Sequence, residues 1–227
     1  MVSLSKWINL QIRKYFRKKF KPSTRKELKP ELEALFKKHG EGIYYVNLKG
    51  KNNNFIAKAI GKYSKGLTHS IVVFYSPKPK KWFSEGQLKV LEQKFNHFYG
   101  DNLGIGDKTK CIIMGSADDD GMNYCDFSRY NTRQISVRFA PLSKVQIKNI
   151  LDFLLKKEIL DACYDYVGLF FWLGGRLIHS KTDWFCSELV YDAFKHINIK
   201  VAKRKRPSPA ELEEYKKEWI IFTNLGM

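Results

Sequence analysis

The chain has 227 residues, of which 44% are hydrophobic and 15% aromatic. This composition excludes an intrinsically disordered chain and supports a sizeable core, in one large domain or two small ones. Lys and Arg outnumber Asp and Glu by 41 to 23, which gives a formal net charge of +18. Such a surface favours anionic partners, namely nucleic acid, acidic lipid headgroups or an acidic polymer, and charge alone does not choose among them.

A basic amphipathic helix is predicted from Leu4 to Phe20, ending near Pro22. Residues 1–38 contain twelve Lys or Arg and three Glu, so this segment carries half of the net charge. Apolar residues recur every four positions along one side of the helix: Leu4, Ile8, Ile12, Phe16 and Phe20. Three roles fit this pattern: packing of the apolar face on the domain, binding of residues 1–22 to an anionic membrane surface, or binding to nucleic acid.

The rest of the chain alternates between helical and strand patterns, without an internal repeat. The predicted strands are 43–48, 68–75, 110–117, 134–139 and 219–222, and residues 123–129 fit either a strand or a loop. The predicted helices are 23–38, 55–63, 84–99, one capped by Ser143 with Val145 on its core face, and one that begins at Cys186. A last helix or turn is predicted to start near 207–212. Residues 50–54 and 118–121 are predicted turns, and 76–81 and 200–206 are predicted basic loops. The strand at 68–75 is almost wholly apolar, so it is expected to be central in its sheet.

The four cysteines are Cys111, Cys125, Cys163 and Cys186. They form no CxxC pair and no Cys/His spacing typical of a zinc module, so we expect free thiols in a reducing compartment. The longest apolar run, 167–175, is shorter than the ~20 residues that span a bilayer. The expected location is the cytoplasm or the periphery of a membrane, with no secretory signal and no transmembrane helix.

The helix predicted after Trp184 opens on Cys186, with Thr182 or Asp183 as its cap. A thiol in the first turn of a helix lies near the positive end of the helix dipole and near free backbone N–H groups. Both favour the thiolate, and the N–H groups suit an oxyanion. From this segment alone, a buried and inert cysteine is the favoured interpretation, because free cysteines are among the most buried residues.

A thiol nucleophile needs a base, and histidine is the usual one because its pKa lies near neutrality. The chain has five histidines: His39, His69, His97, His179 and His196. His69 is distinctive because it lies at the start of the predicted central strand, where the backbone is rigid and a side chain can point into a cleft. A structural histidine at the end of a strand fits this position equally well.

The order of these motifs resembles that of the permuted NlpC/P60 group of papain-like cysteine amidases, and of its YiiX/YaeF-like branch in particular. The resemblance rests on Thr68-His69-Ser70, Gly115-Ser116-Ala117, a Tyr-Asp-Tyr segment and Phe185-Cys186-Ser187-Glu188, in that order. It covers roughly residues 40–222 and implies an α+β fold with a central, mostly antiparallel sheet packed with helices. The chain would then divide into a basic helical extension, 1–39, and a permuted papain-like catalytic domain, 40–227.

The resemblance implies Cys186 as the nucleophile, His69 as the general base and later acid, and Ser116 as the polar residue that orients the imidazole. The group commonly has Glu, or another polar residue, where this chain has Ser116. A hydroxyl fixes the tautomer of the imidazole but stabilises its cation less than a carboxylate does. Three alternatives follow: Ser116 suffices, Asp118 or Asp119 supplies the carboxylate, or the activity is weak.

Tyr164 and Tyr166 either donate hydrogen bonds to the oxyanion or pack in the core, and the run 170–173 either shapes an acyl pocket or packs. The implied function is that of a cysteine-dependent hydrolase or acyltransferase. It would act on an amide or ester bond of a peptide, N-acyl or lipid substrate through an acyl-thioester, without a metal or organic cofactor. The alternative is a non-catalytic basic module that binds nucleic acid or an anionic membrane.

Overall fold

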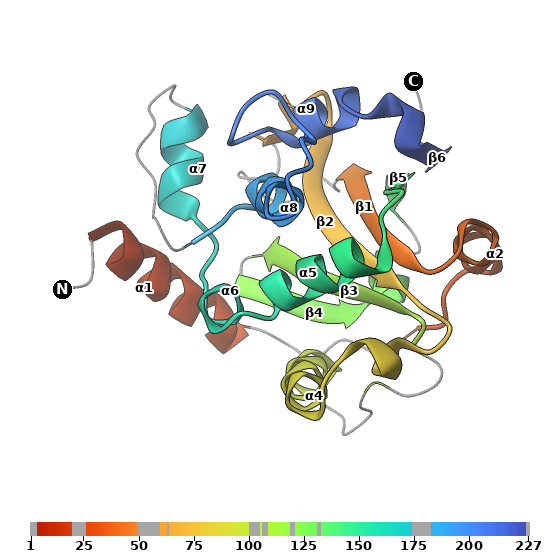
Figure 1. Cartoon of the computed structure of the whole chain (residues 1–227). Coiled ribbons are helices and arrows are strands. Elements are labelled where there is room, and N and C mark those ends of the chain that lie inside the picture. The colour runs from red at the N-terminus through yellow and green to blue at the C-terminus, as the bar shows by residue number, and fades with distance from the viewer. Residues whose placement is uncertain are drawn as a thin grey trace.

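The structure is a computed structural model and describes residues 4–19, 26–49, 60–62, 64–99, 105, 109–118, 121–130, 133–173 and 183–225. These residues form an α+β fold around one six-stranded antiparallel sheet (Figure 1). The strands lie side by side in the order β4-β3-β2-β1-β5-β6. Their bounds are β1 Gly42–Lys49, β2 Leu67–Tyr75, β3 Cys111–Asp118, β4 Gly121–Asp126, β5 Gln134–Phe139 and β6 Ile220–Thr223.

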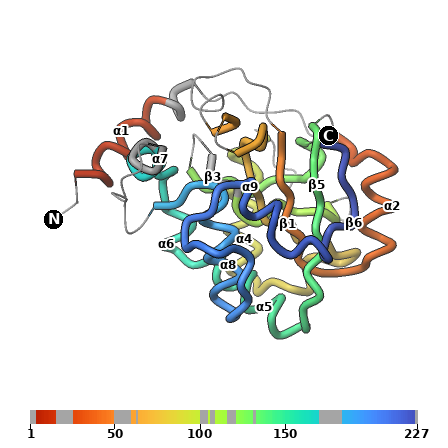
Figure 2. The backbone as a smooth tube through the Cα atoms, turned by 90° about the horizontal axis from the view of Figure 1, so that it is seen from above, coloured from red at the N-terminus to blue at the C-terminus, as the bar shows by residue number. Residues whose placement is uncertain are grey.

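Helices surround this sheet, with α1 and α2 at opposite ends of the molecule and α1 beside α7 (Figures 1 and 2). Their bounds are α1 Leu4–Lys19, α2 Pro30–His39, α4 Glu85–Tyr99, α5 Lys144–Leu154, α6 Lys157–Leu160, α7 Tyr166–Leu173, α8 Cys186–Lys195 and α9 Pro209–Glu214. Short 3-10 turns are η1 Pro79–Trp82, η2 Phe127–Tyr130 and η3 Lys217–Trp219.

The five predicted strands are confirmed, each within about a residue of its predicted bounds, as β1, β2, β3, β5 and β6. The segment that fitted either a strand or a loop forms β4 up to Asp126 and then turns into η2. β2 lies between β1 and β3, as its apolar sequence predicts. Both faces of a central strand are covered, so polar side chains there would lose their contact with water. The helices over 84–99, after Ser143 and from Cys186 are confirmed as well.

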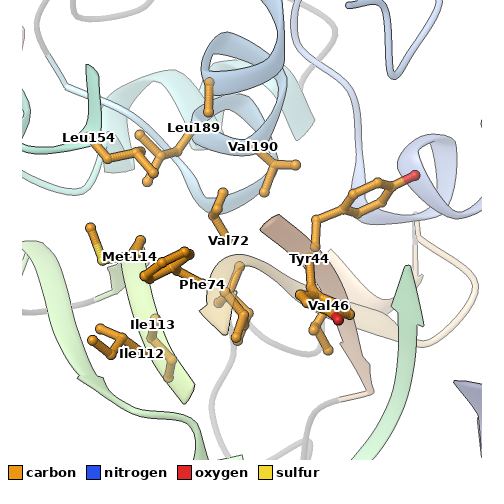
Figure 3. Packing of buried hydrophobic residues seen from close by; sticks show 14 of the residues in the cluster. Tyr44, Val46, Val72, Phe74, Ile112, Ile113, Met114, Leu154, Leu189 and Val190 are labelled. Carbon is orange, nitrogen blue, oxygen red and sulfur yellow. The ribbon is translucent and has the colours of Figure 1, made fainter. Parts of the chain in front are cut away.

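The two faces of the sheet pack against different elements. On one face, the Tyr45 ring meets Phe194 of α8, with ring centroids 5.6 Å apart. Figure 3 shows Leu189 and Val190 of α8 above Val72 of β2 on this same side. On the other face, Phe36 of α2 contacts Tyr44, Tyr75 and Phe127. Because side chains alternate along a strand, each residue of β1 or β2 belongs to one of these two environments.

A buried ion pair fixes α9 to the sheet. Arg138 of β5 is fully buried, and its Nη1 donates to Glu213 Oε2 of α9 at 2.7 Å. Asn47 and Ser136 donate to the same carboxylate at 2.7 and 2.9 Å. Burial alone would raise the pKa of Glu213, but the hydrogen bond and the positive charge of Arg138 outweigh it and lower that pKa.

Two predictions about local structure are wrong, and a third is confirmed only in part. The helix predicted from residue 23 begins at Pro30 instead, because proline suits the first turn of a helix, where its missing N–H needs no partner. Val145 is 69% exposed rather than on the core face of α5. The loop predicted over 76–81 is basic and mostly exposed, as expected, but it contains the start of the short 3-10 turn η1, in which Pro79 is buried.

The N-terminal helix forms as predicted, but it does not dock through its apolar face alone. Asn9 and Arg13 are buried, whereas Leu4, Trp7 and Tyr15 are exposed. The reason is that this helix faces buried carboxylates and backbone carbonyls, which need hydrogen-bond donors rather than methyl groups.

Some predictions fall outside the described residues. They concern the turn at 50–54, most of the helix at 55–63, Phe20, Pro22, Asp119, His179 and Thr182, together with the side chains of Phe16, Ser116, Asp118 and residues 170–173. Among the residues that the structure describes, no helix combines the length and the apolar character needed to cross a bilayer.

Candidate active site around Cys186

Cys186 is the first residue of α8 and is 2% exposed. The residue at the N-cap is Phe185, and its side chain offers no acceptor to the first-turn N–H groups. The predicted capping role of Asp183 is wrong, since this carboxylate accepts from the backbone N–H of Cys163 at 3.0 Å instead. The N-cap residue itself therefore supplies no side-chain cap to the first turn of α8, and a helix N-terminus is a general site for anions.

Close packing on β3 fixes the position of α8. Gly115 has a φ of +99°, and a Cβ at this position would lie 2.9 Å from Leu189 Cδ2. The ladder between β3 and β4 is irregular at the same place, between Met114 and Ser116. Glycine permits both the left-handed backbone and the close approach of α8 to the strand.

The residues that lead into Cys186 are held by two neighbouring segments. Trp184 forms a parallel bridge with Tyr164, and the backbone N–H of Asp165 donates to the Trp184 carbonyl at 3.0 Å. Asn9 of α1 donates its side-chain amide to Asp165 Oδ1 at 3.1 Å and to Asp183 Oδ2 at 3.0 Å. The polar side of α1 thus joins both segments and braces the entry to α8.

A buried carboxyl lies two residues after the thiol. Glu188 is 4% exposed, and Arg206 Nε donates to its Oε1 at 3.0 Å. Its Oε2 is buried without a hydrogen-bond partner among the described residues. Burial raises the pKa of Glu188 to about 7, Asp192 and Asp165 add to the rise, and Arg206 opposes it.

This pair was not identified from the sequence. In the sequence Glu188 belongs to the cysteine motif and Arg206 to the basic loop at 200–206, and no local pattern links the two. Because residues two apart on a helix do not face each other, Glu188 points away from the Cys186 side chain.

Two other cysteines have thiols with raised pKa values, so they ionise less readily than an ordinary cysteine. Burial raises the pKa of Cys111 well above its ordinary value, and the charge of Asp126 adds to the effect. Burial also raises the pKa of Cys163, with Asp183 adding to the rise and Arg13 opposing it. Neither cysteine begins a helix.

His69 lies on β2 opposite Leu48 of β1. Its neighbour Ser70 donates to Asn47 Oδ1 at 2.7 Å, on the face covered by α8 and α9. By alternation His69 belongs to the other face, and its ring centroid lies 6.3 Å from that of Tyr130 in η2. The pairing of β2 with β3 runs from Val73 to Tyr75, so His69 lies beyond its end. An imidazole that reaches Cys186 has to pass this edge of β2. The Cys186–His69 pair stays a prediction.

The remaining predicted residues have these positions. Ser116 lies on β3 opposite Asn123. Tyr164 and Tyr166 are buried, with ring centroids 4.8 Å apart, just before and at the start of α7. Both tyrosines are therefore next to the segment that enters α8, through the bridge to Trp184. Within the described residues no three metal-ligating side chains cluster.

No known family model matches the chain, and no curated protein matches its sequence.

Proposed function

We propose that the chain is a cysteine-dependent hydrolase or acyltransferase that acts on an amide or ester bond, with Cys186 as the nucleophile. One observation carries the proposal: Cys186 is the first residue of α8, at a helix terminus where the N-cap residue Phe185 supplies no side-chain cap. The helix dipole and the backbone N–H groups of a first turn favour a thiolate there and the oxyanion that forms on attack. Burial raises the pKa of Cys111 and of Cys163, so these two thiols are expected to be weak nucleophiles near neutral pH.

The reaction follows the acyl-thioester route. The Cys186 thiolate attacks the carbonyl carbon, and the tetrahedral intermediate collapses with cleavage of the C–N or C–O bond. The leaving amine or alcohol takes a proton from the His69 imidazolium. Water or another acceptor then loses a proton to His69 and attacks the thioester carbon, and the C–S bond breaks to release the acyl product and regenerate the Cys186 thiolate beside the His69 imidazolium. Ser116, Asp118 or Asp119 orients the imidazole in this scheme.

The arrangement of the fold is compatible with the proposed permuted papain-like relationship. A strand with the histidine comes early, the strand with Ser116 follows, and the helix with the cysteine comes late and packs on the antiparallel sheet. Fold-level likeness does not choose a substrate, so the function is tested at the thiol itself.

The test is acylation by a para-nitrophenyl acyl ester, with the modified residue located by mass spectrometry. We expect the folded parent to be acylated at Cys186 and Cys186→Ala to lose this adduct. Cys163→Ala and Cys111→Ala serve as matched controls and should keep it. His69→Ala should slow acylation by about 100-fold. If the parent is acylated equally at several cysteines, or not at Cys186 at all, the proposed nucleophile is refuted.

A non-catalytic module is the second candidate, because the alternation of β2 gives His69 the face opposite to α8. With a charge of +18, such a module would bind nucleic acid with a steep dependence on salt. If His69→Ala is acylated at the same rate as the parent, His69 is not the general base. Salt-sensitive RNA or DNA binding without any acylation would favour this second candidate.

A further inference from the structure

The exposed apolar side chains concentrate on α1. Leu4, Trp7 and Tyr15 are 73%, 54% and 54% exposed, and Val145 of α5 is the other large apolar side chain described as exposed. On a helix with 3.6 residues per turn, Leu4, Trp7 and Tyr15 lie along one side, together with exposed Lys14. They therefore form one stripe rather than scattered contacts, which we call the outer stripe of α1.

The stripe is fixed in its outward orientation by the opposite side of the helix. Asn9 is fully buried and bonds two carboxylates, as described above. Arg13 is 8% exposed, and its Nη1 donates to the Asp161 carbonyl at 3.0 Å. Lys6 lies 3.7 Å from Asp183. Rotating α1 to bury the outer stripe would leave these polar groups without partners, at a large cost.

The chemistry of the stripe suits the boundary between lipid and water. Trp and Tyr place an apolar body in the acyl region and a polar tip among the headgroups, and Lys extends its amine to the surface. The cationic segment continues in the sequence with Arg17, Lys18 and Lys19. A helix with aromatic and aliphatic residues on one side and with basic residues around it is typical of binding to anionic lipid.

The alternatives fit less well. A second copy of this chain would bring another charge of +18 to the interface, which opposes self-association. Nucleic acid would meet the basic residues, but it gives an exposed Leu nothing to bury. The charge therefore selects an anionic partner, and the apolar side chains select lipid.

We propose that α1 binds an anionic lipid surface through Leu4, Trp7, Lys14 and Tyr15, while Asn9 and Arg13 hold the helix on the domain. Because Asn9 and Lys6 contact Asp183, three residues before Cys186, lipid binding at the outer stripe would hold the entry to α8 behind α1, one helix away from the lipid surface. The proposal does not depend on catalysis by Cys186.

The test is co-sedimentation with vesicles of phosphatidylcholine, with and without phosphatidylserine. The variant is the triple substitution Leu4→Gln, Trp7→Gln and Tyr15→Gln, and Val145→Gln is the matched control on another helix. We expect the parent and the control to bind vesicles that contain phosphatidylserine, and the triple variant to bind about tenfold or more weakly. Substitution is preferable to deletion of residues 1–22, because loss of α1 would uncover the buried Asp165 and Asp183.

Circular dichroism and thermal unfolding check that the triple variant is folded. Acylation at Cys186, measured in the same variant, tests the proposed catalytic function separately. Equal binding by the parent and the triple variant would overturn the lipid surface. So would a parent that binds only RNA, or one that dimerises through α1 in sedimentation velocity without binding vesicles. Equal binding to vesicles without phosphatidylserine would overturn the requirement for an anionic surface.

Discussion

Glu188, two residues after Cys186, has an unusual environment for a carboxyl group. Its carboxyl is buried in the first turn of α8, where one oxygen meets Arg206 and the other meets no described partner. Its pKa of about 7 means that the folded protein holds a proton there at pH values where an ordinary Glu is ionised. A neutral carboxyl is compatible with a thiolate in the same turn, while an ionised one opposes it.

This pKa gives stability a defined dependence on pH. Below about pH 4.5 Glu188 is protonated whether the chain is folded or not. Between that pH and about 7 only the folded chain keeps the proton, so the contribution of Glu188 is lost as the pH rises. Relative to Glu188→Gln, the parent should lose about 3 kcal/mol of unfolding free energy between about pH 4.5 and 8.

Urea unfolding of both proteins across this range measures the difference. The exposed Glu158→Gln is the control, and its profile should run parallel to that of the parent. Parallel profiles for Glu188→Gln and the parent would contradict the raised pKa.

Gly115 allows a second prediction at the scale of one residue. Gly115→Ala places a Cβ 2.9 Å from Leu189 at a φ of +99°, so we expect a loss of about 2–4 kcal/mol. Gly86 provides the contrast, because it lies in α4 and a Cβ there meets no atom within 4 Å. Gly86→Ala should stabilise by about 0.5–1 kcal/mol. Chemical denaturation measures both, and a neutral Gly115→Ala would show that α8 is free to move away from β3.

At the scale of elements, the attachment of α1 depends on Asn9. Asn9→Ala removes the donor shared by two buried carboxylates, so we expect a loss of about 2–3 kcal/mol and earlier proteolytic cleavage within α1. Gln11→Ala, at an exposed position of the same helix, is the control and should behave like the parent. Equal protease resistance of both variants would mean that other contacts hold α1.

The strands and most of the longer helices could be predicted because their signals are local. Runs of apolar and β-branched residues define β2 and β3, and Ser143 with Gln146 caps α5 through a capping box. Val145 shows the limit of this reasoning. Its spacing fits the core face, but only the neighbours of α5 decide which residues of its first turn are covered.

At the scale of the whole molecule, the +18 charge determines the sign of a partner, and the fold determines where that partner can bind. Figures 1 and 2 place α1 at the end of the molecule opposite α2. The end with α1 carries the outer stripe and, behind it, the entry to α8, because Asn9 of α1 contacts Asp183. The mixed α+β architecture with an antiparallel sheet is as predicted, whereas the permuted papain-like relationship and the catalytic pair remain proposals.

The sequence by itself determined the elements, the net charge and the position of Cys186 at the start of a helix, because each depends on residues close together in the chain. Only the tertiary structure decided that α1 turns Asn9 inward and Trp7 outward, since the buried carboxylates that require this lie more than 150 residues away. The same holds for the contact of Glu188 with Arg206 and for the face of the sheet that His69 occupies. Long-range pairing sets these features, and a local pattern of residues does not encode it.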